Sequence, residues 1–72
     1  MPYLTVNYDE MGQFAFWREV HYNIEHRLNM VLLREGDNSL RRLANSVRRY
    51  AASRGEVVLV KQREEAVLVT FL

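Results

Sequence analysis

Residues 39–55, SLRRLANSVRRYAASRG, constrain the fold more than any other stretch of the chain. Apolar side chains recur there at steps of three and four residues, which is the spacing of one face of a helix. The face consists of Leu40, Leu43, Ala44, Val47, Tyr50 and Ala51. Gly55 is a typical residue for ending a helix, so we expect a helix over residues 40–54. The rest of the chain must provide an apolar surface that buries this face.

The same stretch contains two copies of a seven-residue pattern in succession, and the helices of a coiled coil are built from such heptads. Two heptads are fewer than the three or four that support a coiled coil. We therefore expect the apolar face of this helix to pack on the chain's own sheet.

Three stretches have the composition of β-strands. In residues 3–8 the side chains alternate between two faces, which is the two-residue period of a strand. Residues 56–72 contain the runs EVVLV and AVLVTF around the polar turn KQREE, which predicts a hairpin. Residues 28–33, LNMVLL, could be a strand or could continue the preceding helix. We favour a strand, because a continuous apolar run is typical of a strand that is buried on both faces.

Between the first two strands the spacing changes to that of a helix. Its expected apolar face is Phe14, Trp17, Val20 or His21, Ile24 and Leu28. Phe16 lies at the edge of this face and is expected to be exposed. Asp9 is the expected cap of this helix, and Asp37, Asn38 or Ser39 the expected cap of the next one.

The resulting order, β-α-β-α-β-β, predicts an α/β (α+β) two-layer sandwich. A mixed four-stranded sheet would carry two helices on one face, in a single domain over residues 1–72. In this order of elements the chain resembles the C-terminal domain of translation initiation factor three and the Alba chromatin proteins. That resemblance implies a fold and no function. The hairpin strands are apolar on both faces, so something must cover the second sheet face, and a second copy of the chain is one candidate.

The positive charge is concentrated although the net charge is only +1. Residues 38–55 hold five arginines and no acidic residue, whereas residues 1–37 hold three arginines and six acidic residues. We call Arg41, Arg42, Arg48 and Arg49 the arginine ridge; Asn45 lies between the two pairs. No acidic residue lies four positions away within the expected helix, and guanidinium groups suit carboxylates and phosphates. Lys61 and Arg63 are expected to extend the ridge. The alternative is an ordinary solvated helix face.

Several classes of function are not expected. The chain has no Cys, and His21 and His26 are five residues apart, which does not place them on one helix face for a metal. The acidic pairs at residues 9–10 and 64–65 are adjacent in turns and do not converge for acid–base catalysis. We therefore expect a non-enzyme without metal or cofactor. The apolar runs are far shorter than the roughly 20 residues of a membrane helix, and the absence of Cys fits the cytoplasm.

Two binding functions remain. The favoured one is a small regulatory protein that docks on an acidic protein surface, such as one in the transcription or translation machinery, through the arginine ridge and the apolar sheet face. The alternative is an RNA- or DNA-binding domain with the ridge on phosphates and Tyr3 or Phe16 stacked on bases. The low net charge favours the protein partner, because domains that bind duplex nucleic acid are usually basic throughout.

Overall fold

A computed structural model describes residues 3–35 and 37–72, with the side chains of all of these except Asp37 and Asn38, and it contains four strands and three helices. Their order is β1 (Leu4–Asn7), α1 (Tyr8–Met11), α2 (Gln13–Glu25), β2 (Met30–Leu33), α3 (Asp37–Ser53), β3 (Val58–Gln62) and β4 (Ala66–Phe71). The strands form one sheet in the order β1-β2-β4-β3, with β1 and β2 parallel and β4 antiparallel to both of its neighbours.

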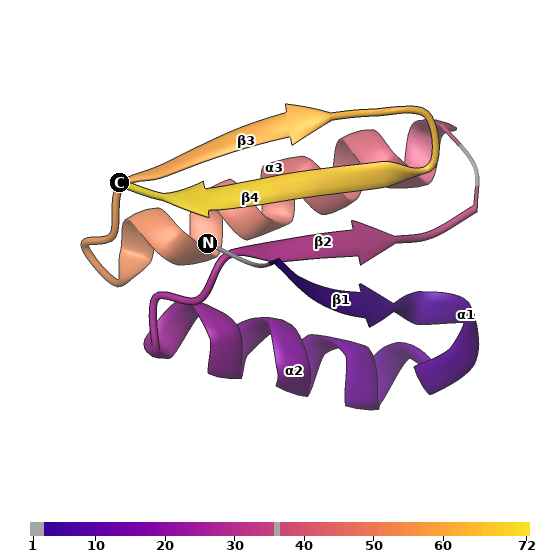
Figure 1. The fold of residues 1–72 in the computed structure, drawn as a ribbon, viewed down its shortest axis with the longest axis horizontal. Coiled ribbons are helices and arrows are strands. Elements are labelled where there is room, and N and C mark those ends of the chain that lie inside the picture. The colour runs from indigo at the N-terminus through magenta and orange to yellow at the C-terminus, as the bar shows by residue number, and fades with distance from the viewer. Residues whose placement is uncertain (1–2, 36) are drawn as a thin grey trace.

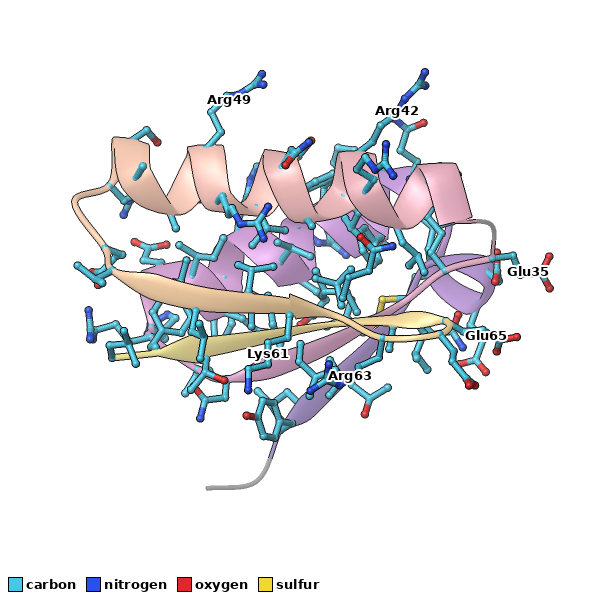
Figure 2. The ribbon with its side chains drawn as sticks, turned by 90° about the horizontal axis from the view of Figure 1, so that it is seen from above. Glu35, Arg42, Arg49, Lys61, Arg63 and Glu65 are labelled. Carbon is cyan, nitrogen blue, oxygen red and sulfur yellow. The ribbon has the colours of Figure 1, made fainter. Side chains whose placement is uncertain are left out.

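Helices α2 and α3 lie on the same side of this sheet (Figures 1 and 2). The predicted two-layer sandwich is confirmed, and so is the choice of a strand within residues 28–33. The single turn of helix α1, which joins β1 to α2, was not expected from the sequence.

The core lies between the two helices and the central strands. Helix α3 buries Leu40, Leu43, Val47 and Ala51, none of which is more than 1% exposed. Beneath the helices, Met30 of β2 pairs with Val69 of β4, and Leu32 pairs with Val67; all four are fully buried. The predicted apolar face of α3 therefore packs on the protein's own sheet.

The two ends of α3 compare differently with the prediction. At the C-terminal end, Gly55 has a φ of 73° and its N–H donates to the carbonyl of Ala52 at 3.0 Å. The N–H of Glu56 donates to the carbonyl of Ala51 at 2.9 Å, which completes a Schellman motif and confirms the predicted stop. At the other end α3 begins at Asp37, so Ser39 lies within the first turn. The capping predicted for Asp37 or Asn38 concerns side chains outside the described set.

Helix α2 is rotated about its axis relative to the predicted face. Its buried residues are Phe16, Val20, Asn23 and Ile24, whereas Phe14 is 80% exposed. The predicted exposure of Phe16 is wrong, because its ring is fully buried edge-on against those of Tyr8 and Trp17. The pattern misleads for two reasons. A polar residue, Asn23, occupies a buried position, and the helix ends at Glu25, so Leu28 is not part of it.

The start of α2 also differs from the prediction. Asp9 does not cap this helix, since it lies inside α1, whose cap is Asn7. Asn7 Oδ1 accepts a hydrogen bond from the Asp9 N–H at 3.0 Å. Gly12 separates the two helices with φ 79° and ψ 165°, a backbone conformation that is essentially restricted to glycine.

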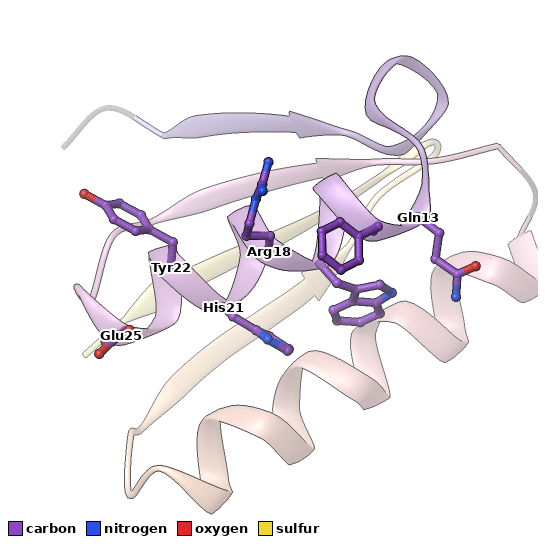
Figure 3. Close-up of a pocket in the computed structure, with 7 residues that line it drawn as sticks. Gln13, Arg18, His21, Tyr22 and Glu25 are labelled. Carbon is purple, nitrogen blue, oxygen red and sulfur yellow. The ribbon is translucent and has the colours of Figure 1, made fainter.

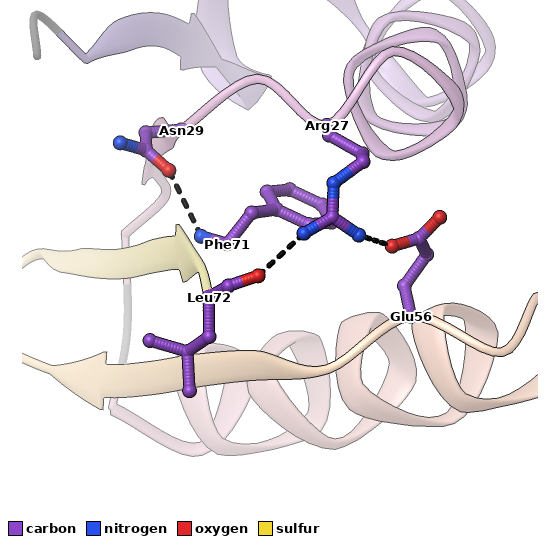
Figure 4. Close-up of polar contacts among 5 residues, drawn as sticks. All are labelled: Arg27, Asn29, Glu56, Phe71 and Leu72. Atoms are coloured by element: carbon purple, nitrogen blue, oxygen red, sulfur yellow. Dashed lines mark hydrogen bonds and ion pairs between the residues drawn. The ribbon is translucent and has the colours of Figure 1, made fainter.

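One arginine ties the end of α2 to the hairpin (Figure 4). The Arg27 guanidinium pairs with the Glu56 carboxylate, donates to the carbonyl of Leu72, and lies 5.6 Å from the centre of the Phe71 ring. The neighbouring Asn29 accepts a hydrogen bond from the Phe71 N–H at 2.9 Å. The loop between α2 and β2 therefore holds the start of β3 and the end of β4 together.

The rotation of α2 can be tested by comparing two phenylalanines. We expect Phe16→Ala to lower the free energy of unfolding by about 3–5 kcal/mol through the cavity it leaves, and Phe14→Ala to change it by less than about 0.5 kcal/mol. Urea denaturation followed by circular dichroism measures both, and Phe16→Leu gives a milder value if Phe16→Ala fails to fold. A loss at Phe14 as large as that at Phe16 would contradict the observed packing.

The two glycines with positive φ in the described part of the chain should respond differently to substitution. A Cβ at Gly12 or Gly55 would meet no atom within 4 Å, so any cost arises from the backbone alone. We expect Gly55→Asn to be nearly neutral, because asparagine tolerates the left-handed region. Gly12→Asn should cost roughly 1–3 kcal/mol, because its ψ lies outside that region. Equal melting temperatures of the two variants would contradict this difference.

Candidate functional site

The outermost part of the arginine ridge is formed by Arg42 and Arg49. Both side chains are exposed and point away from the sheet (Figure 2). They are seven residues apart, which places them about 10 Å apart along the helix axis. The ion pairs among the described side chains are Arg27–Glu56 and Arg54–Glu25, and neither involves the ridge. Glu35 and Glu65 lie at one end of the sheet and not over the outer side of α3.

Arg48 lies on the flank of α3 that faces β3, and Arg41 is seven residues before it on the same side of the helix. Arg48 donates to Asn45 Oδ1 at 3.1 Å and to the backbone carbonyl of Val60 at 3.4 Å. It therefore braces the exposed edge of the sheet and is only partly available to a partner. Because α3 begins at Asp37, that acidic residue lies four positions before Arg41. The expectation that no acidic residue lies at this spacing is thus wrong for Arg41 and holds for the other three arginines.

Lys61 and Arg63 do not extend the ridge, contrary to the prediction. Figure 2 shows both on the side of the sheet opposite to Arg42 and Arg49. Lys61 lies opposite Leu68 in the β3–β4 ladder, one position beyond Val60, which packs on the core. Successive strand residues point to opposite faces, so a basic residue after a core residue faces away from the helices. The two-residue alternation of side chains along a strand therefore already contained this information.

The sheet face without helices is partly apolar, as predicted. We call it the open sheet face; it includes Tyr3, Thr5, Val31, Leu33, Leu59, Lys61, Leu68 and Thr70. Tyr3 is 39% exposed, and its hydroxyl shares a hydrogen bond with Thr70 Oγ1 at 2.9 Å. Val31, Leu33 and Leu68 are only half-buried. This face therefore presents apolar side chains to whatever lies against it.

A third surface was missed by the sequence reasoning. The outer side of α2 holds an open depression of about 820 Å³ (Figure 3). Its lining is Gln13, Phe14, Trp17, Arg18, His21, Tyr22 and Glu25. A second depression, of about 420 Å³, lies between α2 and α3 and is lined by Trp17, His21, Ser46, Arg49, Tyr50 and Ser53. We call the two together the aromatic groove.

The sequence did contain a signal for this groove. Phe14, Arg18 and Tyr22 recur every four residues and therefore share one side of a helix. Arginine at the centre of such a row argues for a solvent-facing side. The assignment of Phe14 to the core obscured this pattern.

Comparison of the chain with protein-family models, with curated proteins and with solved structures finds no match. Among the described residues, no three His, Cys, Asp or Glu side chains form a group that could hold a metal ion. No helix in the described part of the chain has the length and apolar character needed to cross a bilayer. The geometry and charge of the three surfaces are therefore the remaining guide to what the chain does.

Stability measurements can distinguish Arg48, which contributes to the fold, from Arg42 and Arg49, which are exposed to a partner. We expect Arg42→Glu with Arg49→Glu to shift the free energy of unfolding by less than about 0.5 kcal/mol. Arg48→Ala should lower it by about 1 kcal/mol, because the hydrogen bonds to Asn45 and Val60 are lost. Urea titration of the three proteins tests this, and a larger loss in the double variant than in Arg48→Ala would show that Arg42 or Arg49 is structural.

Proposed function

We propose that this chain is a small, non-enzymatic regulatory module that binds an acidic surface of a protein partner through its arginine ridge. The observation that carries the proposal is the position of Arg42 and Arg49, which project outward from α3 with no ion pair to a described side chain. Guanidinium groups pair with carboxylates through two parallel hydrogen bonds, so two of them in a row match a partner with spaced acidic residues.

Binding of RNA or DNA through the ridge is the second candidate. It draws support from the same two arginines, because they would suit phosphates equally well. Its expected base-stacking residues do not fit, however. Phe16 is fully buried, and Tyr3 lies on the open sheet face, away from the ridge. The geometry therefore favours the protein partner.

The test is affinity capture from lysate of the cells that make the protein, with and without nuclease, followed by mass spectrometry. We expect the wild type to retain a specific protein after nuclease treatment, and Arg42→Glu/Arg49→Glu to lose it. Lys61→Glu/Arg63→Glu is the matched control, since it changes the net charge equally on the opposite side of the molecule. It should retain the partner.

Three results would contradict the proposal. Loss of the partner after nuclease treatment, together with a steep fall in affinity with salt, would identify nucleic acid as the ligand. Normal capture by the ridge variant would show that the ridge is only a solvated face. Loss of the partner by the Lys61→Glu/Arg63→Glu control alone would show that the binding site is the open sheet face.

A further inference from the structure

We infer that the aromatic groove binds an amphipathic, acidic helix of the protein partner, with apolar side chains of that helix against Phe14, Trp17 and Tyr22 and its carboxylates on Arg18 and Arg49. The inference rests on the function proposed above. It adds a second contact surface and the chemistry of the partner segment.

The exposure of the aromatic side chains is the first argument. Phe14 is 80% exposed and Tyr22 is 53% exposed, although other apolar side chains of the same helix are fully buried. Together with the half-buried Trp17 they line the larger depression. Clustered exposed aromatic rings are costly in water and are enriched at protein interfaces.

Continuity with the arginine ridge is the second argument. The two depressions share Trp17 and His21, so the surface runs without a break from Phe14 to Arg49. The ring of His21 stacks on that of Tyr50, with centroids 4.0 Å apart and an angle of 11° between the planes. This stack joins the two helices, and both rings line the smaller depression together with Arg49. A segment that fills the groove therefore reaches the ridge.

The charges around the groove determine which segment fits. Arg18 lies 5.7 Å from the centre of the Phe14 ring, and Arg49 lines the opposite end. The one carboxylate in the lining, that of Glu25, is 3.6 Å from the Arg54 guanidinium and is balanced by it. An acidic segment is therefore attracted at both ends of the groove, and a basic one is repelled.

The dimensions suit two turns of a helix. Phe14 and Tyr22 are eight residues apart on α2, which corresponds to about 12 Å. A partner helix with apolar residues at positions i, i+3, i+4 and i+7 spans this distance with one face. Its remaining positions are then free to carry the carboxylates that meet Arg18 and Arg49.

The chain contains one tryptophan, and it lies in the groove, so its fluorescence reports occupancy directly. The probe is a synthetic helical peptide without tryptophan, with Leu and Phe at the four anchor positions and Glu elsewhere. A scrambled peptide of the same composition and a peptide with Lys in place of Glu serve as controls. We expect the amphipathic acidic peptide alone to shift the Trp17 emission to shorter wavelength in a saturable manner.

Substitutions locate the contact. Phe14→Ser/Tyr22→Ser should weaken binding of the acidic peptide about tenfold or more, since a few aromatic anchors carry most of the binding energy of an interface. Arg18→Glu should also weaken it. The matched control is Val57→Ser/Leu59→Ser, which removes exposed apolar side chains (64% and 44% exposed) at the sheet and should leave affinity unchanged. Circular dichroism and melting temperature verify that each variant is folded.

The outcomes separate this inference from the function on which it rests. If Phe14→Ser/Tyr22→Ser binds the peptide and the captured partner normally while Arg42→Glu/Arg49→Glu does not, the groove inference is wrong and the ridge function stands. The groove inference is also wrong if the scrambled peptide binds equally, if the sheet control loses affinity equally, or if only a short RNA shifts the Trp17 emission. Failure of the ridge variant to lose the captured partner contradicts the proposed function itself.

Discussion

Two helices shield only one side of a four-stranded sheet, and this limit determines which surfaces of the protein are structural. On the helix side, Met30 and Leu32 of β2 and Val67 and Val69 of β4 are fully buried. On the other side, the intervening residues of the same strands remain partly accessible. Every candidate binding surface is therefore either the outer side of the helix layer or the open sheet face.

The order and type of the long elements could be predicted because their patterns are unambiguous. Leu43 and Val47 of α3 recur at helical spacing among arginines, and the hairpin strands are rich in Val. The orientation of α2 could not be predicted, because buried Asn23 breaks the apolar pattern and the positive φ of Arg27 ends the helix before Leu28. A prediction from hydrophobic spacing alone therefore placed Phe14 in the core and Phe16 at the surface.

The candidate site was predictable only in part for a related reason. Sequence spacing within one helix placed Arg42 and Arg49 together correctly, because both share the geometry of α3. Which surfaces of different elements lie side by side depends on tertiary packing, and spacing carries no such information. The missed contact of His21 with Tyr50 arises there.

The ridge and the aromatic groove belong to the same layer, whereas the open sheet face looks in the opposite direction. One partner surface can therefore contact the ridge and the groove together, but it cannot cover the open sheet face at the same time. The two sides of the molecule are thus independent surfaces, and a ligand on one leaves the other accessible.

The position of β4 has a consequence for how the chain acquires its structure. This strand comes last in sequence but lies between β2 and β3 in the sheet. Until residues 66–71 are available, β3 has no strand partner and β2 has only β1. The apolar face of α3, which packs on β3 and β4, then lacks part of the surface that buries it. The β3–β4 pairing is local, because the two strands form a hairpin, whereas the β2–β4 pairing joins residues 30–33 to residues 66–69. Joining the β1–β2 pair to the hairpin therefore depends on a non-local pairing, which is a kind of contact that slows folding.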